Sequence, residues 1–184
     1  MPIKTPICDF GQKAKSFKLK STKDEIIKLD DIRGNNATLI MFICNHCPYV
    51  KAIIKDIVED CRNLEQLGVN AVAICANDSV NYPEDSFDKM IEFSNNHNFN
   101  FKYLIDETQE VAKNYNAVCT PDFFGYNKNL ELQYRGRIRE LKNLEPVRNG
   151  ESDLYKAMKK ISETNRGPKK QIPSMGCGIK WFNN

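Results

Sequence analysis

The stretch that decides the fold is FICNHCPYVK (residues 42–51), in which Cys44 and Cys47 are separated by two residues. It overlaps the almost continuous apolar run ATLIMFIC (residues 37–44), which contains β-branched residues. Such a run is typical of a strand buried on both faces, as in a parallel sheet. From Pro48 onward, apolar residues recur with the period of a helix. The two cysteines are therefore predicted to lie between a buried strand and the start of a helix.

The chain on either side extends this alternation of strand and helix. The helix is predicted to end at Gly68, where a left-handed cap is favoured, and residues 69–75 (VNAVAIC) indicate a second buried strand. Strand, helix and strand form a βαβ unit with a right-handed crossover. A helix, a third strand, a short helix with a capping box, a hairpin and a last helix are expected to follow. These segments are residues 82–94, 99–105, 106–115, 123–134 and 154–167.

We expect a single α/β domain, because 184 residues can bury one core and no linker divides the chain. Residues 37–165 form the predicted core. Residues 1–36 are an N-terminal extension that holds a hairpin or short edge strands, and residues 166–184 are a C-terminal tail. The tail is not purely polar, and we expect it to fold back across the domain, with Ile179 and Trp181 packing against the core.

Composition and charge narrow the classes of function. The 27 basic and 24 acidic side chains give a net charge of +3, which does not favour a nucleic-acid partner. No apolar run is long enough to predict a membrane span, and residues 1–13 lack the pattern of a secretory signal. We therefore expect a cytoplasmic protein without a membrane partner. Seven cysteines, an odd number, argue against a permanent disulfide framework in that reducing compartment.

The predicted position of the two cysteines has a chemical consequence. The free N–H groups and the dipole at a helix N-terminus stabilise an anion. We expect them to lower the pKa of Cys44, so that its thiolate is the nucleophile. Cys47, one turn further on, can close a ring with Cys44, and His46 adds a positive charge when protonated. Cys44, Cys47 and His46 are thus the catalytic candidates, and this chemistry requires no bound cofactor.

Two other interpretations of the pair are weighed against the redox one. A structural zinc site takes four ligands, usually as two close pairs, and the sequence has only one C-x-x-C pair. We therefore expect no metal. The pair could also be two reduced thiols without a function. A C-x-x-C that follows a buried strand and opens a helix in a βαβ unit favours the redox interpretation. Cys61 and Cys75 lie in apolar patterns and are interpreted as core residues.

Taken together, several segments resemble those of a known superfamily. They are FICNHCPYVK, ANDSVNYPEDSFDKM, LIDETQEVAKNYNAVCTPDFFGY, YRGRI and PSMGCGIKW, in that order along the chain. The sequence resembles the thioredoxin-like superfamily, and most closely its bacterial branch related to AhpC/TSA and redoxin proteins. This resemblance implies a thioredoxin fold, with a central mixed β-sheet flanked by helices, an N-terminal hairpin and a C-terminal tail extension.

The resemblance also implies a substrate site. Thr120-Pro121 corresponds to the cis-proline loop of a thioredoxin fold, which lies against the redox cysteines. There Thr120 would offer its backbone to an extended substrate segment, as in strand addition. Asn45 and Pro48, beside the cysteines, complete the expected substrate-binding residues. The implied partners are protein disulfides or thiols, together with a small thiol or a thioredoxin-type electron donor.

The sequence departs from the thioredoxin and peroxiredoxin patterns at positions that bear on the predicted activity. Ile43 stands where thioredoxins usually carry Trp, and Asn45-His46 is closer to the X-His pairs of DsbA and protein disulfide isomerase than to Gly-Pro. Neither Cys44 nor Cys47 fits the peroxiredoxin pattern P-x-x-x-T/S-x-x-C. The sequence therefore predicts a thiol–disulfide oxidoreductase. A thiol-dependent peroxidase and a non-catalytic interaction module are the alternatives.

Two further cysteines are accessory redox candidates. Cys119 directly precedes the expected cis-proline dipeptide and should lie near the pair. Cys177 lies in Met-Gly-Cys-Gly (residues 175–178), where glycines permit close backbone approach. Cys177 could form a disulfide with Cys119, act as a third thiol that relays oxidation, or remain a buried free thiol.

Overall fold

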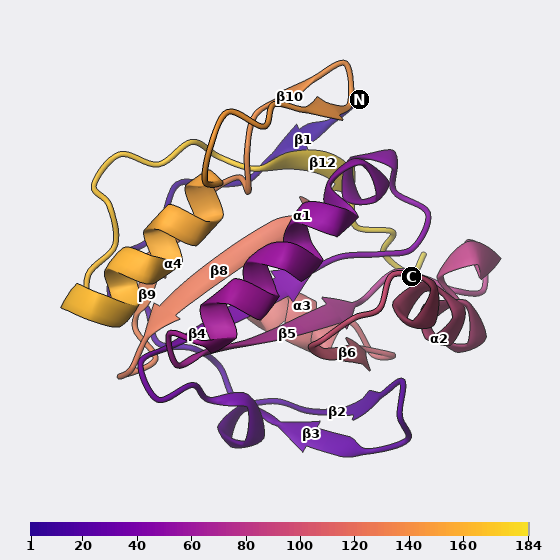
Figure 1. The fold of residues 1–184 in the computed structure, drawn as a ribbon. Helices are drawn as coiled ribbons and strands as arrows, with labels where there is room; N and C mark the ends of the chain where they lie inside the picture. Colours follow the sequence, from indigo (N-terminus) through magenta and orange to yellow (C-terminus); the bar gives the residue numbers. More distant parts are fainter. Residues whose placement is uncertain (184) are drawn as a thin grey trace.

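The computed structural model describes residues 1–183 and is built on a seven-stranded mixed sheet with helices on both faces (Figure 1). The strand order is β3 (Ile26–Lys28), β2 (Lys18–Ser21), β6 (Lys102–Ile105), β5 (Val69–Cys75), β4 (Ala37–Phe42), β8 (Asp122–Asn127) and β9 (Leu132–Tyr134). Strands β4, β5 and β6 are parallel, and the remaining pairs are antiparallel. The expected α/β architecture with a central mixed sheet is confirmed.

Strand β4 lies inside the sheet because both of its faces are apolar. It pairs in parallel with β5 and in antiparallel orientation with β8, and all six of its residues are buried. Leu39 and Met41 belong to the core on one face of the sheet, whereas Ile40 and Phe42 belong to the core on the other face. This placement confirms the buried strand predicted from the continuous apolar run.

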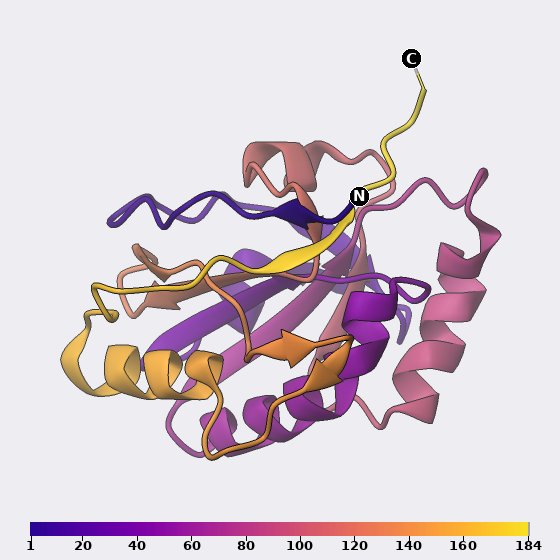
Figure 2. The ribbon, with the colours of Figure 1, turned by 90° about the horizontal axis from the view of Figure 1, so that it is seen from above.

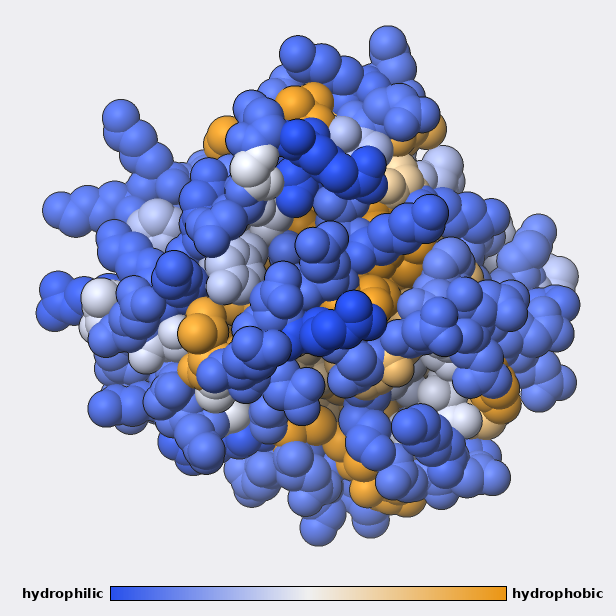
Figure 3. Space-filling view, viewed as in Figure 1, coloured by the Kyte–Doolittle hydropathy of each residue, from blue (hydrophilic) through white to orange (hydrophobic). Residues whose placement is uncertain are grey.

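The helices divide between the two faces of the sheet (Figure 2). Helices α1 (Pro48–Glu65), α2 (Phe87–Asn96) and α4 (Asp153–Thr164) cover one core, and the short α3 (Glu110–Asn114) covers the other. Two 3-10 turns, Leu29–Ile32 and Pro83–Asp85, precede β4 and α2. Among residues 1–183, no helix combines the length and the apolar character needed to cross a membrane. The face seen in Figure 3 is mostly hydrophilic, with small scattered apolar patches.

Backbone conformation at the helix ends explains where the sequence analysis was right and where it was not. Gly68, with φ of 72°, follows α1 as predicted. The last helix was expected to reach Gly167, but it ends at Thr164 because Asn165 is left-handed, with φ of 64°. The capping box expected before α3 is absent, since Gln109 is itself left-handed and its side chain makes no cap hydrogen bond.

Both ends of the chain are built into the fold. The predicted N-terminal hairpin is β2 and β3, and β2 also pairs with β6, so that the hairpin forms one edge of the central sheet. A second sheet has the order β1 (Ile3–Lys4), β12 (Met175–Gly178) and β7 (Cys119–Thr120). A small hairpin, β10 (Leu141–Lys142) and β11 (Glu145–Pro146), precedes α4.

The C-terminal tail returns across the domain, as predicted from its apolar residues. Strand β12 pairs with β7, so residues near the end of the chain lie beside the loop that follows residue 118. Ile179 is buried in the α3 core. Trp181 departs from the expectation, because 38% of its surface is exposed and the Lys113 ammonium lies over its ring.

Candidate redox site

The two cysteines lie at the predicted junction between a buried strand and a helix. Cys44 follows β4, and Cys47 is the N-cap residue of α1, with Pro48 as the first helical residue. Both are free thiols, and Cys44 and Cys47 are only 1% and 0% exposed. The local sequence explains this geometry, because Pro48 has the backbone angle needed at the first helical position and lacks an N–H to satisfy.

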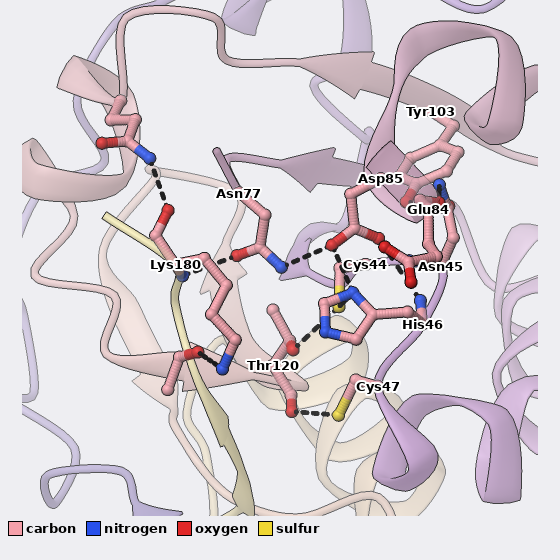
Figure 4. A network of polar contacts seen from close by, with 12 residues as sticks. Cys44, Asn45, His46, Cys47, Asn77, Glu84, Asp85, Tyr103, Thr120 and Lys180 are labelled. Atoms are coloured by element: carbon pink, nitrogen blue, oxygen red, sulfur yellow. Dashed lines mark hydrogen bonds and ion pairs between the residues drawn. The ribbon is translucent and has the colours of Figure 1, made fainter. Parts of the chain in front are cut away.

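Thr120 contacts both sulfurs from the opposite side of the site (Figure 4). Its Oγ1 lies 3.3 Å from the Sγ of Cys44, and its carbonyl oxygen lies 3.2 Å from the Sγ of Cys47. The Thr120-Pro121 peptide bond is cis, as the resemblance implied. The expected loop therefore does lie against the pair.

The two thiols differ sharply in their electrostatic surroundings. Hydrogen bonds from the thiols of Cys44 and Cys177 and from the Val50 N–H lower the pKa of Cys47 to about 5, against the opposing effect of burial. The hydrogen bond to Cys47, burial and the nearby Asp85 carboxylate raise the pKa of Cys44 well above its ordinary value. The thiolate form is thus favoured at Cys47 and disfavoured at Cys44.

This distribution corrects the expectation that the pKa of Cys44 falls. The helix begins at Pro48, four residues after Cys44, and Cys47 is its N-cap residue. Cys44 instead faces a buried carboxylate, which disfavours a second negative charge. A lowered pKa was expected at Cys44 from the sequence, whereas the surroundings of the two thiols lower it at Cys47.

Asp85 organises the loop that carries the cysteines. Its Oδ1 accepts hydrogen bonds from the backbone N–H of Asn45 at 2.8 Å and of His46 at 3.3 Å. Its Oδ2 lies 2.5 Å from the Nδ1 of His46 and accepts a hydrogen bond of 2.8 Å from the amide of Asn77. Because the Asp85 side chain is fully buried, these contacts fix the loop backbone and the orientation of the imidazole.

Asn45 points into the protein and not toward solvent. Its amide nitrogen donates to the carbonyl of Glu84 at 3.0 Å, and its Oδ1 accepts from the hydroxyl of Tyr103 at 2.8 Å. Asn45 is 6% exposed. Its expected contact with substrate is therefore not available in this structure, and it supports the loop from within.

The outer surface of the site is formed by His46 and its neighbours. The imidazole is 24% exposed and stacks on the ring of Tyr82, with the centroids 5.8 Å apart. Its Nδ1 also lies 4.0 Å from the Sγ of Cys44. Pro48, at the start of α1, is exposed. These residues are the accessible rim beside the buried pair.

The backbone edge that was expected to bind a substrate segment is occupied by the chain itself. In the antiparallel pairing of β7 with β12, Cys177 is opposite Thr120 and Gly178 is opposite Cys119. Gly176 fits tightly here, since a Cβ atom on it would lie 1.9 Å from the carbonyl oxygen of Thr120. The place assigned to a partner is thus filled by β12.

The two accessory cysteines do not occupy equivalent positions. Cys119 is fully buried, with its Sγ 3.7 Å from the carbonyl oxygen of Pro121, and burial raises its pKa. Cys177 is partly exposed and interacts with Cys47. The sulfur that faces Cys47 is therefore that of Cys177, whereas the Sγ of Cys119 contacts the Pro121 carbonyl.

Three side chains of the site could together hold a metal ion. The Sγ of Cys44, the Nδ1 of His46 and a carboxylate oxygen of Asp85 all lie within 4.8 Å of one another. A structural zinc site takes four ligands. The Asp85 oxygens also already accept three N–H hydrogen bonds, from Asn45, His46 and Asn77. The donor set fits a hydrogen-bonded network better than it fits a metal centre.

Sequence reasoning missed several residues that build the site. Asp85 and Tyr82 were interpreted as part of a helix start, although they form the 3-10 turn and its entrance beside His46. Asn77 joins Asp85 to the tail by accepting the Lys180 N–H at 2.9 Å. The one available signal was the segment ANDSVNYPEDSFDKM, which carried part of the family resemblance without indicating individual roles.

Comparison with known proteins places this site in a family. A model of the AhpC/TSA family matches residues 10–141. A conserved protein from Geobacillus kaustophilus is 36% identical, with a TM-score of 0.94 over 100% of this chain and 98% of that chain. A hypothetical protein from Sinorhizobium meliloti 1021 is 30% identical, with a TM-score of 0.90 over 98% of each chain.

More distant structures share the fold. A secreted Mycobacterium tuberculosis disulfide oxidoreductase homologous to Escherichia coli DsbE has a TM-score of 0.55 and 17% identity, over 64% of this chain and 80% of that chain. No curated protein sequence gave a match. The family match spans the central sheet, the C-x-x-C pair and the cis-proline loop. The protein is a thioredoxin-fold redoxin, and the chain belongs to the AhpC/TSA family.

Proposed function

We propose that the protein is a thiol–disulfide oxidoreductase that exchanges disulfides through Cys44 and Cys47. The observation that carries this proposal is the C-x-x-C pair at the start of α1, against the cis Thr120-Pro121 loop, with the thiolate form favoured at Cys47. A thiolate is the form that attacks a disulfide, and a second thiol within reach can resolve the product.

The charge on Cys47 sets the order of the two steps. The Cys47 thiolate attacks a partner disulfide, so that a bond forms between Cys47 and one partner sulfur while the other partner sulfur leaves as a thiolate. Cys44 then loses its proton and attacks the Cys47 sulfur. This forms the Cys44–Cys47 disulfide and releases the second partner thiolate. The reverse sequence oxidises a dithiol partner and reduces the protein.

His46 supports the resolving step. Its Nδ1 lies 4.0 Å from the Sγ of Cys44 and 2.5 Å from the Oδ2 of Asp85. The Nδ1–H donates to the Asp85 carboxylate, so this nitrogen does not take the Cys44 proton; a protonated imidazole instead places a positive charge beside the Cys44 sulfur as its thiolate forms. We therefore assign His46 the role of stabilising the Cys44 thiolate and Asp85 the role of positioning the imidazole.

The proposed partners follow from the same chemistry. They are proteins or small thiols that carry a disulfide or a dithiol, with electrons supplied by a small thiol or a thioredoxin-type donor in the cytoplasm. Protein groups alone carry out both exchange steps. Because Cys44 and Cys47 are buried, a partner must approach over the rim formed by His46 and Pro48 or through a group that reaches the surface.

The test is the redox equilibrium of the pair in a glutathione series, measured by differential alkylation and mass spectrometry. We expect a reversible Cys44–Cys47 disulfide in the wild-type protein. We also expect Cys47→Ser to abolish the reduction of a disulfide peptide, with Cys8→Ser, a substitution away from the site, as the matched control. A pair that never closes, or that is protected from alkylation by a co-purifying metal, contradicts the proposal.

Peroxide reduction is the second candidate, because a thiolate with a pKa of about 5 is also the form that peroxide oxidises. Peroxide would convert Cys47 to a sulfenic acid. The Cys44 thiol would then condense with this sulfenic acid to give the same disulfide and water. Rapid, stoichiometric consumption of hydrogen peroxide that is lost in Cys47→Ser would favour this activity. A non-catalytic binding module instead predicts partner binding that survives the Cys44→Ser/Cys47→Ser double substitution.

A further inference from the structure

The redox site contains a third sulfur that the C-x-x-C pair does not account for. We propose that Cys177 is a redox-active thiol that forms a second, alternative disulfide with Cys47 and thereby connects the buried pair to the protein surface. This inference rests on the proposed exchange activity of Cys44 and Cys47, and it adds the residue through which that activity reaches a partner.

Strand pairing places Cys177 on the face of the redox pair. Cys177 is directly opposite Thr120 in the antiparallel pairing of β12 with β7. Side chains opposite each other in such a pair extend from the same face, with Cβ atoms about 4.5–5.5 Å apart. The Thr120 side chain points at Cys44, whose Sγ lies 3.3 Å from its Oγ1. Cys177 therefore extends from the strand toward the same sulfurs.

Cys47 lies between the other two sulfurs. It caps α1, its Sγ contacts the carbonyl oxygen of Thr120 at 3.2 Å, and interactions with both Cys44 and Cys177 act on its thiol. Cys177 also packs against the apolar core that contains Cys44 and Cys47. A central thiolate with a thiol on either side can form a disulfide with either of them.

Cys119 provides an internal contrast. It precedes Thr120 on the same strand, and adjacent residues of a strand point to opposite faces. The residue opposite Cys119 is Gly178, which offers no sulfur. Although it is close in sequence to the cis-proline bond, Cys119 is therefore excluded from the three-sulfur group.

The segment that carries Cys177 is firmly held. The Ile179 N–H donates to the carbonyl of Val118 at 3.2 Å, and the carbonyl oxygen of Lys180 accepts from the Asp78 N–H and the Gln109 amide, each at 2.8 Å. On the other side of β7, the Ser174 hydroxyl donates to the carbonyl of Pro121 at 2.8 Å. The fold thus holds Cys177 beside Cys47, so their contact does not require movement of a flexible tail.

The three thiols differ in their exposure to solvent, and this difference gives Cys177 a role. Cys44 and Cys47 are buried, whereas Cys177 is partly exposed. A partner sulfur that cannot reach the pair can therefore reach Cys177. Moving the disulfide from Cys44–Cys47 to Cys47–Cys177 brings it to the surface without opening the core.

The transfer is an ordinary thiol–disulfide exchange. The Cys177 thiolate attacks the Cys47 sulfur of the Cys44–Cys47 disulfide, so that the Cys47–Cys177 bond forms and Cys44 leaves as a thiolate that takes up a proton. A partner thiolate then attacks Cys177 and releases the Cys47 thiolate. A second partner thiol displaces Cys177, so the partner gains a disulfide and the protein becomes fully reduced by two electrons.

Electrostatics favour formation of the Cys177 thiolate and the later release of Cys47. In the reduced protein, burial and the negative charge of Cys47 raise the pKa of Cys177 to about 11. Once Cys47 is in a disulfide it carries no charge, so this contribution disappears, and the nearby Lys180 ammonium still favours the Cys177 thiolate. Cys47 is also the better leaving group, because thiols of low pKa leave faster.

Removing Cys44 isolates the proposed bond. We would oxidise Cys44→Ser with glutathione disulfide and map its disulfides by non-reducing peptide mass spectrometry. The expected result is a Cys47–Cys177 disulfide, which persists in Cys44→Ser/Cys119→Ser. In Cys44→Ser/Cys177→Ser this bond is lost, and glutathione should remain attached to Cys47. Circular dichroism and thermal unfolding of each variant establish that it is folded.

Two results would overturn the inference. One is stable glutathione on Cys47 in Cys44→Ser, at the same level as in Cys44→Ser/Cys177→Ser. The other is a disulfide from Cys47 to Cys119. The wild-type glutathione titration separates this failure from failure of the proposed function. If the wild type closes Cys44–Cys47 but Cys44→Ser forms no Cys47–Cys177 bond, only the third thiol is rejected. If the wild type closes no disulfide, both proposals fail.

Discussion

At the scale of single residues, the surroundings of the two sulfurs decide which thiol ionises at the lower pH. Interactions with Cys44 and Cys177 lower the pKa of Cys47, the N-cap residue of α1, to about 5 against the effect of burial. We expect the ultraviolet absorbance of the thiolate to rise through about pH 5, and this transition to vanish in Cys47→Ser. Subtracting the two pH titrations isolates the group. A transition that persists in Cys47→Ser but vanishes in Cys44→Ser would place the charge on the other sulfur.

Asp85 is predicted to hold Cys44 in its protonated form. Its carboxylate contributes to the raised pKa of Cys44, so Asp85→Asn in a Cys47→Ser background should make Cys44 ionise at a lower pH than in Cys47→Ser alone. Thiolate absorbance measures this shift. Glu84→Gln is the matched control, because Glu84 is exposed and only its backbone carbonyl contacts the loop. An unchanged titration in both variants would contradict the electrostatic role of Asp85.

The same substitution should weaken the fold. An asparagine at this position has one acceptor oxygen for contacts that now use both carboxylate oxygens, and buried N–H groups of the loop would lose partners. Leaving a buried donor unpaired costs about 1–3 kcal/mol. We expect the free energy of unfolding of Asp85→Asn, measured in urea, to fall by roughly that amount. A value equal to that of Glu84→Gln would mean that the loop holds its shape without Asp85.

At the scale of secondary-structure elements, the junction of α1 and α4 is sensitive to pH. Asp60 of α1 accepts a 2.5 Å hydrogen bond from Ser152, whose hydroxyl in turn accepts from the Tyr155 N–H at the start of α4. Burial raises the pKa of Asp60 to about 7. In the folded state this carboxyl therefore binds a proton at pH values where the unfolded chain has released it.

The direction in which stability changes with pH follows from the pKa of Asp60 in the two states. The folded pKa lies above the unfolded value, so the contribution of Asp60 to stability is complete below the unfolded pKa and is lost as the pH rises through about 7. We expect Asp60→Asn to gain stability relative to wild type between about pH 5 and about pH 8, by roughly 1–3 kcal/mol. Urea unfolding at the two pH values tests this, with the exposed Glu59→Gln as the control. An identical difference at both values would exclude Asp60 as the titrating group.

At the scale of the whole molecule, the two ends of the chain meet beside the redox site. β12 lies between β1 and β7, and Gly176 is pressed against the carbonyl of Thr120. The added methyl of Gly176→Ala would meet backbone atoms, so β12 must shift. We expect faster amide hydrogen exchange in β7 and β12 and a loss of stability of about 1–3 kcal/mol. Met175→Ala, which alters an exposed side chain of the same strand, is the control. Equal exchange in the two variants would show that the strand adapts.

The sequence allowed the local parts of this architecture to be predicted. The apolar pattern of β4, the helical period of α1 and the left-handed Gly68 each depend on neighbouring residues, and all three predictions are confirmed. The cis peptide at Thr120-Pro121 was reached only through the family resemblance. These features place the C-x-x-C pair correctly between strand and helix.

Other features depend on contacts between distant segments, which periodicity cannot show. The pairing of β12 with β7 joins residues more than fifty positions apart, and a strand of Met, Gly, Cys and Gly has little intrinsic preference for a sheet. The buried position of Asp85 depends on the packing of a 3-10 turn over the loop. The low pKa of Cys47 depends chiefly on its interactions with the Cys44 thiol and with Cys177 of the distant tail, which local sequence patterns do not show.

The burial of Cys44 and Cys47 separates two properties that usually increase together, the chemical reactivity of a thiol and its accessibility to solvent. An exposed thiolate reacts with whatever electrophile is most abundant. Here the two sulfurs are shielded by the chain's own imidazole, tail and cis-proline loop. The rate of reaction then depends more on how well a molecule binds these covering groups than on how often it collides with the protein. A scarce molecule that binds them can therefore compete with an abundant one that does not. The fold in this way converts a generic reactivity into kinetic selectivity.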